Sequence, residues 1–150
     1  MKPLKYPRLL AGLFALLLLA SSSFADDLER LEGKWTTEKK APDGETIKVS
    51  IEISKGKFKY RISDISGGLK LYAEGSVKLE KQGLFNAVRF SDIKGGQNES
   101  DLSDVNDDRV NLYVLGYETL TMAGNFDRER EQAPSLDVFK KAPKTDEKKK

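Results

Sequence analysis

Hydrophobic and polar residues alternate with a period of two along much of this chain. Within Glu45–Ser54, Ile or Val occupies every second position from 47 to 53, and Lys57–Ser63 alternates in the same way. This period indicates β-strands with one buried and one solvated face. We therefore expect Lys55 and Gly56 to form a two-residue turn, with the glycine supplying a positive φ. The turn predicts that Ile53 faces Phe58, Ile51 faces Tyr60 and Val49 faces Ile62, with Glu52 opposite Lys59 on the outer face.

A longer alternation from Leu69 to Leu79 predicts the next strand, in which Gly75 is expected to mark a bend or bulge. We expect Gln82 and Gly83 to turn the chain into a strand over Leu84–Ser91. A two-residue loop at that point predicts that Val77 faces Val88 and Gly75 faces Phe90, while Phe85 points outward.

The remaining segments complete an all-β pattern. The polar stretch Lys94–Asp108 is expected to be a loop, with a solvated acidic part over residues 99–108. Further strands are predicted over Gly33–Lys40, Arg109–Val114, Glu118–Phe126 and Ser135–Lys141, after a short helical opening at Asp27–Glu32. An odd-length loop around Gly116 would pair Leu112 with Leu120 and Val110 with Met122. About eight antiparallel strands joined by short turns predict an up-and-down barrel.

The N-terminus has the three parts of a signal peptide. Lys2, Lys5 and Arg8 precede an apolar run from Leu9 to Ala20, and Ser23 and Ala25 place small residues before Asp26. The alternative is a retained membrane anchor, but a dozen residues make a helix of roughly 18 Å, short of the ~30 Å hydrocarbon core. We expect cleavage after Ala25 and a soluble mature form in the periplasm or outside the cell, with no transmembrane segment.

The charge of the chain changes when this segment is removed. The whole chain has a net charge of +2, but without residues 1–25 it has 23 basic against 24 acidic residues, and residues 26–139 alone carry a net −5. An acidic domain does not favour nucleic-acid binding. The balance returns with the six lysines that follow Phe139. The tail over residues 142–150 is expected to be disordered, and it either keeps the protein in solution or attracts an anionic surface. One domain over residues 26–141 is expected, and we expect it to be a monomer.

The segment Leu31-Glu32-Gly33-Lys34-Trp35 resembles the opening Gly-x-Trp signature of the lipocalin and calycin barrels. In those folds the tryptophan closes the base of the barrel and a basic residue packs across its ring. The resemblance implies that Gly33, Trp35 and a basic residue close this barrel, with Arg128 as the candidate and Arg130 as the alternative. The segments from Tyr113 to Met122 and from Leu136 to Lys141 are also similar to those of small exported bacterial domains of unknown function, described as planctomycete-type and lipocalin-like.

The chain has few of the side chains that usually perform catalysis. The chain contains no His and no Cys, which excludes an imidazole base, a thiol nucleophile and nitrogen or thiolate zinc ligands. The acidic stretch Glu99–Asp108 does not have the spacing of a calcium-binding EF-hand loop. We therefore expect neither an enzyme nor a metal or cofactor site.

Aromatic residues at strand positions are the candidates for a binding site. They form either a ligand cage or plain core, and six are considered: Trp35, Phe58, Tyr60, Tyr72, Phe90 and Tyr113. An eight-stranded barrel is about wide enough for one small ligand. The sequence thus favours an exported binding domain for a small apolar ligand, and the alternative is a structural or interaction module of the cell envelope whose barrel is filled by its own side chains.

Overall fold

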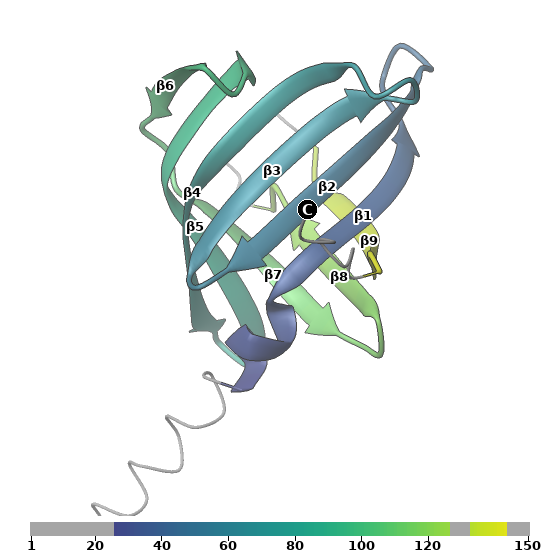
Figure 1. Cartoon of the computed structure of the whole chain (residues 1–150). Coiled ribbons are helices and arrows are strands. Elements are labelled where there is room, and N and C mark those ends of the chain that lie inside the picture. Colours follow the sequence, from purple (N-terminus) through teal and green to yellow (C-terminus); the bar gives the residue numbers. More distant parts are fainter. Residues whose placement is uncertain (1–25, 127–132, 144–150) are drawn as a thin grey trace, which may run out of the picture. The chain divides into compact units, whose positions relative to one another are not determined.

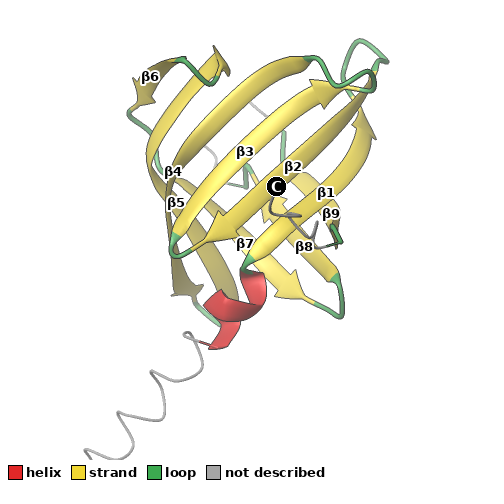
Figure 2. Cartoon of the chain, in the orientation of Figure 1, coloured by secondary structure: helices red, strands yellow, loops and turns green. Residues whose placement is uncertain are grey.

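The computed structural model describes residues 26–126 and 133–143. The chain divides between Arg30 and Leu31 into two units. Residues 26–31 form a short helix, coloured red in Figure 2, which begins one residue before the predicted start. The expected signal peptide, Arg128 and residues 144–150 of the expected tail lie outside the described residues.

Eight strands close into an antiparallel barrel, as predicted, and a ninth is added to it (Figure 1). The strands are β1 (Gly33–Lys40), β2 (Thr46–Ser54), β3 (Lys57–Asp64), β4 (Leu69–Gln82), β5 (Phe85–Asn98), β6 (Asp101–Val105), β7 (Arg109–Leu115), β8 (Thr119–Gly124) and β9 (Ser135–Lys141). Each barrel strand pairs with the next along the chain, and β1 pairs with β9 to close the circle. The domain is therefore an all-β, lipocalin-like barrel of up-and-down order.

The β2–β3 hairpin has the predicted register. Ile51 pairs with Tyr60, and Glu52 pairs with Lys59. Both turn residues adopt positive φ, 50° at Lys55 and 72° at Gly56, as a type I′ turn requires. The turn is also held from outside the hairpin, because the Lys55 backbone N–H donates to Glu32 Oε1 at 2.7 Å.

The predicted register of the β4–β5 hairpin is wrong by two residues. Gly83, with φ of 60°, occupies the first of the two turn positions instead of the second, so the turn is formed by Gly83 and Leu84. Val77 consequently pairs with Phe90 rather than with Val88. A shift of two keeps the same side chains on the inner face, because side chains alternate with a period of two. Phe85 points outward as expected and is 64% exposed.

Gly75 lies at a β-bulge, which confirms the expectation for this position. The β4–β5 register shifts between Glu74 and Ser76, and Asp92 on the opposite strand has a φ of 52°. A side chain at Gly75 would clash, because an added Cβ would lie 2.5 Å from the Ser91 carbonyl oxygen and 2.8 Å from Phe58 Cε1. The two strands approach closely only because this residue has no side chain.

Part of the predicted loop over Lys94–Asp108 is a hairpin instead. β5 continues to Asn98, and β6 pairs with it from Ile93↔Val105 onward. The Asn98 side chain shapes the connection by accepting hydrogen bonds from the backbone N–H and hydroxyl of Ser100. Side-chain periodicity could not reveal β6, because most of its residues are exposed and its formation depends on backbone pairing with β5.

The predicted β7–β8 register is also wrong. Leu115 pairs with Leu120 and Tyr113 with Met122, so Leu112 does not face Leu120. The loop is an even, two-residue turn closed by a hydrogen bond from the Gly116 N–H to the Thr119 carbonyl, and Glu118 adopts the positive φ of 53°. The prediction was wrong because it gave the loop an odd number of residues.

Candidate ligand-binding cavity

The interior of the barrel contains a cavity of about 430 Å³ that is open to solvent and is lined by residues from β1 to β9. Its apolar wall contains side chains from six strands: Ile51, Phe58, Leu71, Phe90, Met122 and Phe139. These side chains face inward because they occupy alternate positions on strands that pair around the circle. The interior is thus partly filled and partly hollow.

Three of the six predicted aromatic site residues line this cavity: Phe58, Tyr60 and Phe90. The rings of Phe58 and Phe90 contact each other edge to face, with centroids 4.8 Å apart and planes at 69°. They come from β3 and β5, which flank β4 on its two sides, and Gly75 on β4 leaves room for the Phe58 ring. The pair forms part of the cavity wall.

The other three predicted aromatics do not line the cavity. Trp35 and Tyr113 are buried in the core, 1% and 4% exposed. Tyr72 occupies the alternate position to the cavity-lining Ala73 and so lies on the outer side of β4, where the Arg61 guanidinium is 5.2 Å from its ring centroid and its hydroxyl donates to Glu74 Oε2 at 2.7 Å. Burial and this contact with Glu74 raise the pKa of Tyr72 to about 12. Tyr72 is therefore buried on the outer side of β4, where it is 2% exposed, and does not line the cavity.

One side of the cavity is polar, which the sequence analysis missed. The Lys39 ammonium lies 2.9 Å from both carboxylate oxygens of Asp137, and this pair joins the neighbouring strands β1 and β9 on the cavity side. Arg109 Nε lies 2.9 Å from Asp107 Oδ2, and its NH1 group is 3.5 Å from Asn125 Oδ1. Lys39 and Asp137 lie at the same alternate positions as the inward-facing Trp35 and Phe139 on their strands. The period-two pattern could therefore have predicted that both side chains face the interior.

Four neutral polar side chains also line this cavity: Tyr60, Asn111, Asn125 and Ser135. Within the described residues, neither the Tyr60 hydroxyl nor the Asn111 amide has a hydrogen-bond partner, and no fully buried side-chain nitrogen or oxygen lacks one. The two groups therefore reach open space in the cavity that they line. Burial, together with the nearby negative charge of Asp137, raises the pKa of Tyr60 to about 12, so its hydroxyl remains a proton donor at neutral pH.

Trp35 is held at one end of β1 by three neighbours. Its indole N–H donates to the Leu31 carbonyl at 2.8 Å, and the Lys141 ammonium lies 4.9 Å from its ring centroid. Gly33, with φ of 121°, leaves room for this lysine, because an added Cβ would lie 3.1 Å from Lys141 Cε. Thus Gly33 and Trp35 meet a basic residue at the end of the last strand, and that residue is Lys141; the predicted Arg128 lies outside the described residues.

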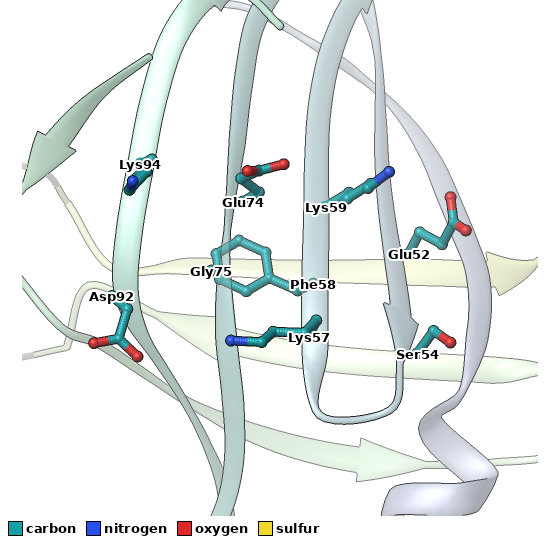
Figure 3. Close-up of a pocket in the computed structure, with 9 residues that line it drawn as sticks. All are labelled: Glu52, Ser54, Lys57, Phe58, Lys59, Glu74, Gly75, Asp92 and Lys94. Atoms are coloured by element: carbon teal, nitrogen blue, oxygen red, sulfur yellow. The ribbon is translucent and has the colours of Figure 1, made fainter.

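A second pocket of about 430 Å³ lies on the outer surface of β2 to β5 (Figure 3). Four of its charged side chains belong to a row of cross-strand neighbours that alternates in sign over six strands: Lys34, Glu52, Lys59, Glu74, Lys94 and Asp104. Opposite charges at facing positions stabilise a strand register. Because each charge has neighbours of the opposite sign, we interpret this surface as one that maintains the register of the sheet.

Three further observations bear on the function classes. Over residues 26–126 and 133–143 no helix has the length and hydropathy needed to cross a membrane. In the same ranges no three acidic side chains gather into a group suited to a metal ion. No protein-family model, curated protein sequence or solved structure matches this chain.

Proposed function

We propose that this protein is an exported, non-enzymatic binding domain that holds one small, largely apolar ligand inside its barrel. The observation that carries this proposal is the cavity of about 430 Å³ within the barrel. Ligand pockets in proteins span about 300–1,000 Å³ and combine apolar walls with a few polar groups. The cavity has both, with the Phe58–Phe90 pair in its wall and Lys39, Asp137 and Asn111 on its polar side.

The proposed location is the periplasm or the outside of the cell, reached through a signal peptide that is cleaved after Ala25. Within the same proposal, the protein is one of the small, exported, lipocalin-like domains of planctomycete type. Intact-mass measurement of the protein recovered from an expressing bacterium tests the export step. A mass that begins at Asp26 supports it, and a mass that includes residues 1–25 contradicts it.

The binding proposal is tested with two matched substitutions, Ala73→Phe and Ala123→Phe. Ala73 lines the cavity, whereas Ala123 occupies the alternate position between the cavity-lining Met122 and Gly124 and so lies on the outer face of β8. The measurement is a calorimetric titration of the wild type and both variants with a long-chain alcohol. We expect saturable binding at one site in the wild type and in Ala123→Phe, and loss of binding in Ala73→Phe.

Failure of the wild type to bind any apolar probe would favour the structural alternative, in which the barrel serves only as an interaction module. Equal binding by Ala73→Phe and Ala123→Phe would place the ligand outside the barrel and would contradict the proposal. Thermal unfolding of both variants is the control. Loss of binding in Ala73→Phe supports the proposal only if this variant remains folded.

A further inference from the structure

The charged side chains that line the cavity already have partners within the protein. Lys39 is bound by both carboxylate oxygens of Asp137, each at 2.9 Å. Arg109 is bound by Asp107 at 2.9 Å and approached by Asn125 at 3.5 Å. The positive charge of each base is thus compensated by one acid.

A ligand with a charged head would have to break one of these pairs. A carboxylate that reached Lys39 would displace or adjoin the carboxylate of Asp137, and the side chain of Asp137 is only 24% exposed. An ammonium head would have to displace Lys39 from Asp137. Removing one partner from a partly buried ion pair leaves a charge without compensation, which is unfavourable.

Two neutral polar groups of the cavity are, in contrast, available. The Tyr60 hydroxyl and the Asn111 amide have no protein partner among the described residues, and both line the same space. A hydroxyl can donate one hydrogen bond and accept others, and a primary amide offers both donor hydrogens and an acceptor oxygen. Each of the two can therefore bind an uncharged head group such as an alcohol or an amide.

We propose that the ligand of this barrel is an uncharged amphiphile, with an apolar chain or ring against Phe58 and Phe90 and a neutral hydrogen-bonding head at Tyr60 and Asn111. This inference rests on the proposed binding function and defines its ligand class. It excludes free fatty acids in their ionised form as preferred ligands. The discrimination comes from Asp137, which neutralises the one lysine that would otherwise attract a carboxylate.

The test compares decanol with decanoate, two probes with the same chain length and different heads, by calorimetric titration of the full chain at neutral pH. We expect the wild type to bind decanol at least about tenfold more tightly than decanoate, because decanoate must displace one ion pair and decanol need not. Tighter binding of decanoate would overturn the inference while leaving the binding function intact. Binding of neither probe would overturn both.

Asp137→Asn is the decisive variant, since it keeps the size of the side chain and removes its charge. The Lys39 charge is then uncompensated, so we expect affinity for decanoate to rise about tenfold or more and affinity for decanol to change little. Asp104→Asn on the exposed strand β6 is the matched control and should change neither. An Asp137→Asn variant that remains folded, as judged by its unfolding midpoint, and gains no affinity for decanoate would contradict the assigned role of the Lys39–Asp137 pair.

Discussion

Gly75→Ala tests whether the close approach of β4 and β5 depends on a missing side chain. An added Cβ would lie 2.5 Å from the Ser91 carbonyl oxygen, 2.8 Å from Phe58 Cε1 and 3.1 Å from the Asp92 carbonyl oxygen. Two of these three atoms belong to the backbone, so a rotamer change cannot relieve the contact and the bulge must open. Gly75 does not have a positive φ, and the clash is therefore the main cost.

The magnitude follows from two opposing effects. Overpacking a close-packed site costs about 1–3 kcal/mol, and alanine in a strand regains about 0.5–1 kcal/mol of backbone entropy relative to glycine. We expect a net loss of about 1–2 kcal/mol in the free energy of unfolding, or roughly 4–8 °C in midpoint for a domain of this size.

Gly95→Ala is the matched control, because Gly95 also lies in a strand without positive φ. Its nearest neighbour, Val105 Cγ2, would be 3.5 Å from an added Cβ, which is an ordinary contact. This variant should be unchanged or more stable by about 0.4–1 kcal/mol. Thermal and denaturant unfolding of both variants measure the difference in their stability. Equal midpoints would refute the claim that Gly75 is required because a side chain would clash there.

Two further predictions concern groups that the fold brings together. Because the pKa of Tyr60 is raised to about 12 in the folded state, the stabilisation from its neutral hydroxyl is complete below pH ~10 and is lost as the pH rises towards ~12, by about 3 kcal/mol at most. Denaturant unfolding should therefore show a steeper alkaline loss of stability in the wild type than in Tyr60→Phe, and parallel curves would contradict this. Lys141→Met removes the cation–π contact with Trp35, so we expect it to lose about 0.5–2 kcal/mol of unfolding free energy and to alter Trp35 emission. Lys140→Met is the control and should do neither, so indistinguishable variants would refute the contact.

The candidate site shows which part of its chemistry could be predicted from the sequence. The alternation of Phe58 and Tyr60 with lysines on β3 places both aromatics on the inner face, and both line the cavity. Tyr72 was grouped with them because of its residue type, although the alternation of β4 assigns it to the outer face. Residue type was therefore a weaker guide than parity, and the same parity would have found Lys39 and Asp137.

The sequence by itself determined the strands of the barrel and their inner faces, because burial of one face imposes a period of two that is visible in local order. It also determined the β2–β3 register, since Lys55-Gly56 admits one turn geometry. Only the tertiary structure decided the registers of β4–β5 and β7–β8, where a turn could close at several positions and pairing along the whole strand selected one. Three further features depend on chain segments that come into contact only in the folded barrel: the strand β6, the Lys141 contact on Trp35 and the pairing of Lys39 with Asp137. A local sequence pattern cannot predict contacts between segments that are far apart in the chain.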